Sequence, residues 1–190
     1  MKTPAYVLLL VLLLALLNCP DAGARSDGET PPPASVTWPV DDTLFRPCSL
    51  SGARLAGVFP GFRSARSLAE PFPVLEILGP EDSMLGLVAC SDHAATTADG
   101  FAGPVPVLVC VGPDGALLDF EVLRNRETPS YLTMALSGDF PERMKAYRTG
   151  RPEPVDAVSF ATISSLAIIG SVSGTVDRLV EEALLIEVEQ

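Results

Sequence analysis

Residues 105–122, VPVLVCVGPDGALLDFEV, decide how the centre of this chain folds. Valine occupies every second position from 105 to 111, so one side of an extended segment is continuously apolar. The next four residues, Gly112-Pro113-Asp114-Gly115, are typical of a turn, and residues 118–122 then alternate apolar and acidic side chains. The pattern predicts an antiparallel hairpin.

Elements on both sides of this hairpin extend the fold. The apolar runs 74–78 and 84–90 flank the turn-rich sequence Gly79-Pro80-Glu81-Asp82, which predicts two more paired strands. A short helix is expected over 140–147, within an otherwise mixed stretch from 130. Strands followed by helix, without regular strand-helix-strand alternation, predict an α+β domain with a small, mostly antiparallel sheet packed by a C-terminal helix.

The C-terminal helix is predicted from apolar residues spaced by three and four positions. The expected apolar face comprises Leu166, Ile169, Val172, Val176, Leu179 and Ala183, and the residues expected elsewhere are Ser165, Ser171, Thr175, Arg178 and Glu182. Gly170 and Gly174 each weaken a helix by about 1 kcal/mol relative to alanine. We interpret this pair as permitting close contact with the sheet.

The N-terminus has the layout of an export signal. Lys2 precedes an apolar run over 5–17, and Ala22-Gly23-Ala24 is a small-x-small cleavage pattern. As a helix the run spans about 20 Å, shorter than the roughly 30 Å hydrocarbon core of a membrane. Residues 1–24 are therefore a signal peptide or membrane anchor, and the alternatives are cleavage, lipid attachment at Cys19, or retention. All three place the domain outside the cytoplasm, on the periplasmic side.

Residues 25–66 are expected to form a linker and an irregular N-terminal segment, ahead of a domain spanning 67–190. Pro31-Pro32-Pro33 favours a stiff, extended tether within the proline-rich part of the linker. Scattered aromatic residues without a steady period over 41–66 predict only local packing.

Charge and composition exclude several function classes. Against 13 Lys and Arg stand 24 Asp and Glu, and the net charge of −11 repels nucleic-acid phosphates, so no nucleic-acid partner is expected. His93 is the only histidine, which argues against a histidine metal site, and no metal site is predicted. Cys90 and Cys110 are interpreted as small core residues, with one disulfide among Cys48, Cys90 and Cys110 as the alternative.

Three polar segments interrupt this framework. They are Thr96-Thr97-Ala98-Asp99-Gly100-Phe101-Ala102-Gly103-Pro104 before the valine strand, Arg126-Glu127-Thr128-Pro129 after the hairpin, and Asp156-Ala157-Val158-Ser159-Phe160-Ala161-Thr162 before the last helix. Taken singly, they are typical of a turn, a strand exit and a helix N-cap. Their order along the chain carries more information than any one of them.

In this order the segments resemble the FMN-binding domain family, whose members include flavin-carrying subunits of Rnf-type ion-translocating oxidoreductases and of sodium-translocating NADH:quinone reductases. The resemblance covers roughly residues 70–185. Thr97 to Pro104 is similar to the family's Thr-x-Asp-Gly-Tyr/Phe-x-Gly-Pro segment, and Glu127-Thr128-Pro129 to its Glu-Thr-Pro loop, after which Ser130-Tyr131-Leu132 departs from the family's glycines. Asp156, Ser159, Ala161 and Thr162 match its Asp-x-x-Ser/Thr-Gly-Ala-Thr pattern, in which Phe160 replaces glycine.

The resemblance implies FMN held covalently through a phosphoester on the Thr162 hydroxyl. Amide groups over 163–166, at the helix start, would bind the phosphate, with hydroxyls of Ser159, Ser164 and Ser165 adding hydrogen bonds. The cofactor-binding residues expected from the resemblance are Thr162, Asp156, Ser159, Ala161, Ile163, Ser164, Glu127, Thr128, Pro129, Asp99, Gly100 and Gly103. The loops 127–129 and 99–103 are candidates for the walls of the isoalloxazine slot, where Tyr131 stacks or fills the space.

The expected role is that of an electron carrier without catalytic residues of its own. No His or Lys lies beside Thr162 to activate its hydroxyl, so a separate Mg²⁺- and FAD-dependent flavin transferase is the expected maturation partner. The leading hypothesis is an extracytoplasmic flavoprotein subunit of an Rnf-like membrane redox complex. The alternatives are a free-standing exported flavoprotein of another electron-transfer chain and a non-redox binding module that has lost covalent flavin.

Overall fold

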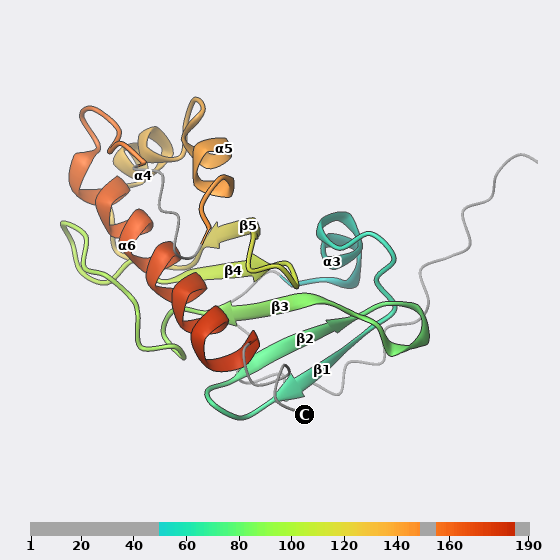
Figure 1. Ribbon diagram of the computed structural model, residues 1–190. Helices are drawn as coiled ribbons and strands as arrows, with labels where there is room; N and C mark the ends of the chain where they lie inside the picture. The colour runs from blue at the N-terminus through green and yellow to red at the C-terminus, as the bar shows by residue number, and fades with distance from the viewer. Residues whose placement is uncertain (1–49, 149–154, 185–190) are drawn as a thin grey trace, which may run out of the picture. The chain divides into compact units, whose positions relative to one another are not determined.

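A computed structural model describes residues 50–148 and 155–184. These residues build a five-stranded antiparallel sheet in the order β1-β2-β3-β4-β5 (Figure 1), so every strand pairs with its neighbour in sequence. The strands are β1 (Ser64–Leu68), β2 (Val74–Leu78), β3 (Met84–Cys90), β4 (Val107–Val111) and β5 (Leu117–Val122). The helices are α3 (Gly52–Val58), the 3-10 turn η1 (Pro80–Asp82), α4 (Pro129–Ala135), α5 (Phe140–Lys145), α6 (Thr162–Leu179) and the π-helical η2 (Val180–Leu184).

The α+β prediction is confirmed, and so is the hairpin. In β4 and β5, Val107 pairs with Val122 and Val109 with Phe120. The turn between them closes with a hydrogen bond from the Gly115 amide to the Gly112 carbonyl at 3.0 Å, and Gly115 has a φ of +76° that favours glycine. The predicted strands 74–78 and 84–90 are β2 and β3 with the predicted bounds.

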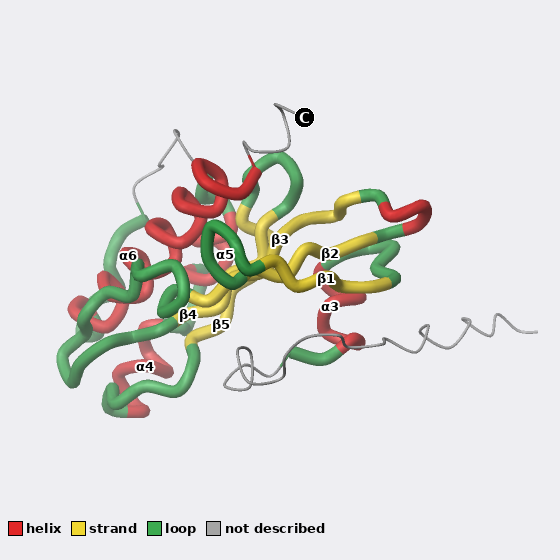
Figure 2. The backbone as a smooth tube through the Cα atoms, turned by 90° about the horizontal axis from the view of Figure 1, so that it is seen from below, coloured by secondary structure: helices red, strands yellow, loops and turns green. Residues whose placement is uncertain are grey.

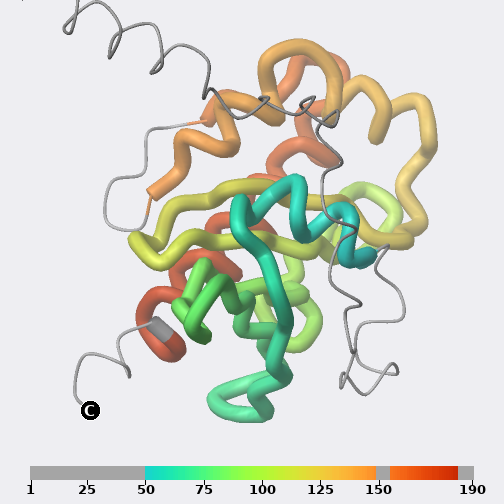
Figure 3. Tube along the Cα trace, turned by 90° about the vertical axis from the view of Figure 1, so that its right-hand side faces the viewer, coloured from blue at the N-terminus to red at the C-terminus, as the bar shows by residue number. Residues whose placement is uncertain are grey.

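Alternation along the strands divides the apolar side chains between two faces of the sheet. Val107, Val109 and Val111 pack in the cluster that includes α6, whereas Leu108 and Cys110 pack in the cluster that includes α3. Figure 2 shows α6 and α3 on opposite sides of the strands, and in Figure 3 α3 lies in front of the β4–β5 hairpin. The sheet is therefore covered on both faces.

The cysteine interpretation is confirmed for the two residues that the structure describes. Cys90 and Cys110 are free thiols buried in the cluster on the α3 side. Burial raises the pKa of the Cys110 thiol to about 12 and also raises the pKa of Cys90, because a thiolate is disfavoured away from water. Cys48, together with the predicted export segment 1–24, Cys19 and the linker as far as residue 49, lies outside the described residues.

The interval before residue 67 is more regular than predicted. Helix α3 begins after Ser51, whose hydroxyl accepts a hydrogen bond from the Arg54 amide at 3.2 Å, and β1 begins at Ser64. Arg54 forms ion pairs with Asp119, at 3.2 Å, and with Glu121 on the hairpin. The elements are seven and five residues long, too short to show a clear apolar period, and their contacts to the sheet stabilise them.

Helix α4 was also not predicted, whereas α5 confirms the short helix expected over 140–147. Helix α4 starts with Pro129 in its first turn and buries Ala135. Proline is favoured at the first helical position, because its missing N–H would have no partner there. Its position immediately after Glu127-Thr128 makes α4 one side of the candidate site.

The buried face of α6 differs from the predicted one. Leu166 is 53 % exposed, whereas Ser171 and Thr175 are fully buried. The Ser171 hydroxyl donates to the Val105 carbonyl at 2.9 Å and accepts from the Ala98 amide at 2.8 Å. Hydrogen bonding to the loop that links β3 to β4 therefore orients the helix, which apolar periodicity alone does not detect.

The glycines of α6 contact this same loop. A Cβ atom on Gly170 would lie 3.2 Å from that of Ala98, and one on Gly174 would lie 3.2 Å from that of Thr96. The expected close contact is therefore present, but it is made with the loop rather than with a strand. Among the described residues, α6 extended into η2, Thr162–Ala183, is also the one helix long and apolar enough to span a membrane, but half of its most apolar window is buried within the fold.

Candidate functional site

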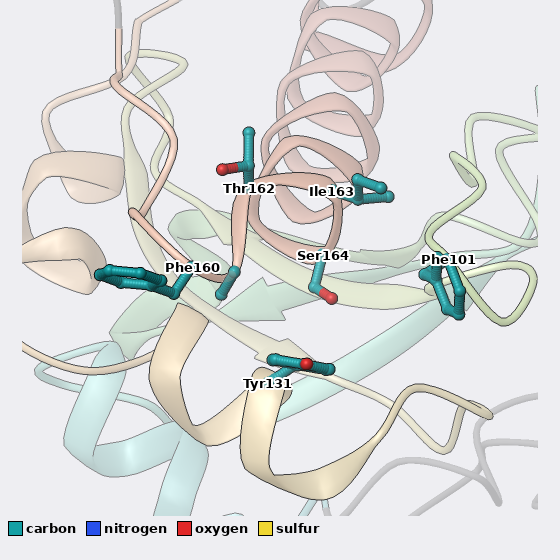
Figure 4. A pocket seen from close by; sticks show the side chains of 7 residues that line it. Phe101, Tyr131, Phe160, Thr162, Ile163 and Ser164 are labelled. Carbon is teal, nitrogen blue, oxygen red and sulfur yellow. The ribbon is translucent and has the colours of Figure 1, made fainter.

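A cavity of about 390 Å³ opens at the N-terminal end of α6. Its volume is within the range of about 300 to 1,000 Å³ that is typical of small-molecule sites. The lining residues come from the loop before β4, from α4 and from the start of α6, and Figure 4 shows their side chains. They are Phe101, Tyr131, Phe160, Ala161, Thr162, Ile163 and Ser164.

Thr162 is the first residue of α6 and its side chain is exposed at this cavity. Among the described residues, its hydroxyl is within hydrogen-bond range only of the Val158 carbonyl, at 3.5 Å, which is the outer limit of such a bond. In Figure 4 the side chain points away from Tyr131, toward open space. The hydroxyl is therefore accessible from solvent.

The first turn of α6 leaves amide groups for an anion. Ala161 is the N-cap residue and has no side-chain oxygen, so it does not satisfy the amides of Thr162, Ile163 and Ser164 as serine or aspartate would. The Ser165 amide donates to the Ala161 carbonyl at 2.9 Å. The predicted set over 163–166 is therefore wrong at its end, and the available amides are those of residues 162–164.

Glu127, in the second polar segment, is bonded both to the first polar segment and to the first turn of α6. Its carboxylate is buried, accepts a hydrogen bond from the Ala102 amide at 2.6 Å, and accepts another from the Ser164 hydroxyl. Its own amide donates to the Asn125 side chain at 2.9 Å. Glu127 therefore holds the 99–103 loop against the start of α6 and acts as a brace, whereas the sequence predicted a wall of the slot.

The 99–103 loop is a tight structure that presents Phe101. The Gly100 amide donates to the Gly103 carbonyl at 2.8 Å, and Asp99 forms an isolated bridge with Pro104. A Cβ atom on Gly100 would lie 2.8 Å from a carboxylate oxygen of Glu127, so only glycine permits this approach. Gly103 has a φ of +124°, the second position here where glycine is required.

The serine hydroxyls near the helix start have internal partners. Ser164 donates to Glu127, and the Ser165 hydroxyl accepts from the Val158 amide at 2.9 Å and donates to the Thr162 carbonyl at 3.0 Å. Both serines are buried, so they brace the turn and are not free to bind a phosphate as predicted. Ser159 is exposed on the preceding turn and does not line the cavity.

Phe160 adopts a backbone conformation that phenylalanine rarely adopts. Its φ is +66°, in the left-handed region, which costs a non-glycine residue roughly 1 to 2 kcal/mol. Its side chain is 87 % exposed at the rim of the cavity. The replacement of glycine in the resembled pattern thus keeps a glycine-like backbone and adds an aromatic ring.

The structure separates the remaining predicted residues from the cavity. Asp156 is exposed, with one carboxylate oxygen 4.0 Å from the Arg143 guanidinium, and Thr128 and Pro129 are exposed at the start of α4. Of the predicted residues, Ala161, Thr162, Ile163 and Ser164 line the cavity, and Glu127, Gly100 and Gly103 shape its rim. Phe101 was not among the predicted residues, although an aromatic residue inside a polar glycine loop was a usable signal.

The exposed large apolar side chains of the described residues gather at this site. They are Phe101, Tyr131, Met134, Phe160, Ile163 and Leu166. Four of them line the cavity, while Met134 follows Tyr131 by one helical turn and Leu166 follows Ile163 in the same way. Exposed apolar groups in one place indicate a binding site, since elsewhere such side chains are buried.

The site combines an accessible hydroxyl, three first-turn amides and a slot bordered by aromatic rings, which fits a planar aromatic group carrying a phosphate. In a comparison with family models, residues 100–177 match the model of the FMN-binding domain. The match contains Glu127 and Thr162 but starts later and ends earlier than the 70–185 expected from the resemblance. No curated protein matches the chain in sequence. The region that carries the cavity is therefore similar to an FMN-binding domain, and this match supports FMN as its cofactor.

Proposed function

We propose that this chain is an extracytoplasmic electron-carrier flavoprotein that holds FMN through a phosphoester bond to the Thr162 hydroxyl. The observation that carries the proposal is the accessible hydroxyl at the first residue of α6, beside the aromatic cavity and inside the region that matches the FMN-binding domain. The other residues of the site then have defined roles.

The start of α6 supplies the electrostatic stabilisation that a phosphoester needs. Amide groups of residues 162–164 point out of the first turn, where the helix dipole favours negative charge. The chain has a net charge of −11, so a phosphate requires such local donors. The hydrogen bonds that the Glu127 carboxylate accepts come from the Ala102 amide and the Ser164 hydroxyl, so these donors partly neutralise its negative charge.

Attachment requires a second enzyme. The bond that forms joins the Thr162 oxygen to the phosphorus of the FMN moiety, the bond that breaks is the pyrophosphate linkage of FAD, and AMP leaves. The hydroxyl proton passes to a base of the transferase, because the described partner of the Thr162 hydroxyl in this chain is a carbonyl, which is a poor base. An Mg²⁺- and FAD-dependent flavin transferase is therefore the proposed maturation partner.

When bound, FMN supplies reversible uptake and release of one or two electrons. The chain's own residues position the cofactor and exclude water from part of it. Phe101, Tyr131 and Ile163 provide apolar surface around the slot, and Glu127 keeps the slot's two sides together. Carriage of electrons between partners is thus the activity that this arrangement supports best.

The proposed setting is the outer side of a membrane, as a subunit of an Rnf-like redox complex, with a free-standing exported flavoprotein as the second candidate. The apolar run over 5–17 supports export in both cases. A retained N-terminal segment that co-purifies with membrane redox subunits favours the complex. A cleaved or lipidated N-terminus without such subunits favours the free-standing carrier.

Coexpression with a flavin transferase tests the attachment. We expect the protein to gain the mass of one FMN less one water, with Thr162→Ala abolishing the gain and Thr162→Ser keeping it, because serine retains the hydroxyl. Thr128→Ala is the matched control, since Thr128 is another exposed threonine beside a helix start and its loss leaves the gain unchanged. An unmodified wild-type mass contradicts the proposal and favours a non-redox binding module. A modified Thr162→Ala protein contradicts the assignment of the attachment site to Thr162.

A further inference from the structure

We propose that Phe160 is a cofactor-binding residue whose ring stacks on the isoalloxazine of the flavin attached to Thr162. This inference rests on the proposed function and goes beyond it, because it assigns a role in this chain to the residue that departs from the resembled pattern. The inference predicts that the Phe160 ring determines how the flavin is held. It also predicts that the flavin-free protein is more stable when residue 160 is one that tolerates a positive φ.

The backbone at Phe160 shows that the residue is not there for the fold. Among the described residues, four that are not glycine have positive φ: Glu81, Asp82, Ala95 and Phe160. Phe160 is the largest of these four residues, and it is the one whose apolar side chain is larger than the methyl group of alanine. Because its ring is 87 % exposed, packing inside the protein does not compensate for the unfavourable backbone. A ligand that covers the ring provides the missing compensation.

The turn around Phe160 holds the ring at the rim of the cavity. The Ala161 amide donates to the Val158 carbonyl at 3.1 Å, and the Val158 amide donates to the Ser165 hydroxyl at 2.9 Å. Ala161 itself is buried, so the residues on either side of Phe160 are anchored. With both neighbours fixed and φ positive, the Phe160 side chain is directed away from the protein interior, and it lines the same cavity as Thr162.

The other aromatic rings at the cavity indicate the shape of the group that fits there. In Figure 4, Phe160 and Phe101 lie at opposite sides of the site, and Tyr131 lies between them below Ser164. Phe101 and Tyr131 are 78 % and 49 % exposed. Three exposed rings from three different segments border one space, and a flat aromatic system offers faces to several of them at once. Phe160 is two positions from Thr162, so an attached flavin lies within its reach.

Four variants separate the ring from the backbone strain. Phe160→Leu keeps the strain and removes the ring, Phe160→Asn removes both because asparagine tolerates positive φ, and Phe160→Tyr keeps both. Glu81→Asn is the matched control, since Glu81 also has a positive φ, of 57°, and does not line the cavity. Covalent loading of each protein is measured first by mass.

In the loaded proteins, we expect the ratio of stacked to unstacked flavin, read from fluorescence-lifetime amplitudes, to fall about 2- to 13-fold in Phe160→Leu and Phe160→Asn. Phe160→Tyr and Glu81→Asn keep the wild-type ratio. In the flavin-free proteins, the melting temperature rises by about 2 to 4 °C in Phe160→Asn and in Glu81→Asn, but not in Phe160→Leu. The fluorescence lifetimes thus report on the aromatic ring, and the melting temperatures report on the backbone strain.

Several results would overturn the inference. Fully loaded Phe160→Leu and Phe160→Asn proteins with wild-type lifetimes would show that the ring does not touch the flavin. Failure of these variants to become loaded would assign the ring to recognition by the transferase instead. An unmodified wild-type mass would overturn the proposed function as well, so the two failures are distinguishable.

Discussion

The two ends of helix α6 differ in how they are held. Toward the C-terminus, Thr175 bonds to Thr96 at 2.7 Å, Arg178 bonds to the Ala94 carbonyl, and the guanidinium of Arg178 lies 5.0 Å from the centre of the Phe72 ring. At the N-terminus, Ile163 is more than half exposed and the N-cap Ala161 provides no side-chain bond. The C-terminal part of α6 is therefore bonded to neighbouring segments, and we call it the anchored end. The first turn is held by the Ser164 and Ser165 hydroxyls but leaves backbone amides and the Ile163 side chain exposed, and we call it the open end.

This difference shows how the fold tolerates a costly site. An uncapped first turn, exposed apolar side chains and a left-handed phenylalanine are each unfavourable for folding. The buried face of α6 and its hydrogen bonds to the 94–105 segment offset these costs. Stability is thus concentrated where no ligand is expected, which leaves the first turn available for binding.

The largest expected effect comes from breaking the anchored end. Gly174→Leu places a side chain against Thr96, whose Cβ lies 3.2 Å from the position of a Cβ on residue 174, and overpacking of this kind costs about 1 to 3 kcal/mol. Chemical denaturation measures the loss. Gly57→Leu is the control, because a Cβ on Gly57 has nothing within 4 Å, and its stability changes little or rises. Equal losses in the two variants would contradict the comparison.

An intermediate effect is expected at Glu127, which joins the first turn of α6 to the 99–103 loop. Glu127→Gln replaces a carboxylate that accepts from both Ala102 and Ser164 with an amide that has one acceptor oxygen, so one of these two hydrogen bonds is lost or reverses its direction. The free energy of unfolding should fall by about 0.5 to 1.5 kcal/mol, the net contribution of one hydrogen bond.

Hydrogen exchange at the Ala102 amide should become faster in the same variant, because that amide is held by the Glu127 carboxylate. Glu142→Gln is the control, since Glu142 is an exposed residue paired with Lys145 at 3.1 Å and such pairs contribute about 0 to 1 kcal/mol. A Glu127→Gln protein as stable as this control would show that the brace is unimportant.

The smallest effect is expected at the open end. Thr162→Ala should change the free energy of unfolding of the flavin-free protein by less than about 0.5 kcal/mol, because the side chain is exposed and its one described hydrogen bond is 3.5 Å long. Thermal and chemical denaturation measure this change. A large loss of stability would mean that Thr162 is part of the fold's framework, and the proposed contrast between the two ends of α6 would then be wrong.

Much of the fold could be predicted from the sequence, because its strands carry local signals. The valines of β4 and the turn 112–115 specify the hairpin by themselves. By contrast, Leu166 was assigned to the buried face of α6 and Ser171 to the other, and both assignments are wrong. The polar partners of Ser171 lie at Ala98 and Val105, more than sixty residues away, so no local pattern reveals them.

The candidate site could be predicted in part for the same reason. Thr162 and its immediate neighbours lie together because they are consecutive in the chain. The role of Glu127 as a brace depends on contacts to Ala102 and Ser164, on two other segments. Phe101 and Tyr131 border the cavity only because these contacts bring the 99–103 loop and α4 to the start of α6.

The sequence alone determined the α+β class, the four strands β2 to β5 and the helix that begins at Thr162, since each depends on residues close together in the chain. Only the tertiary structure decided which face of α6 is buried, which serine hydroxyls have hydrogen-bond partners within the protein, and which aromatic rings surround the cavity. Those features depend on hydrogen bonds and packing between distant segments, whose geometry exists only after the chain has folded.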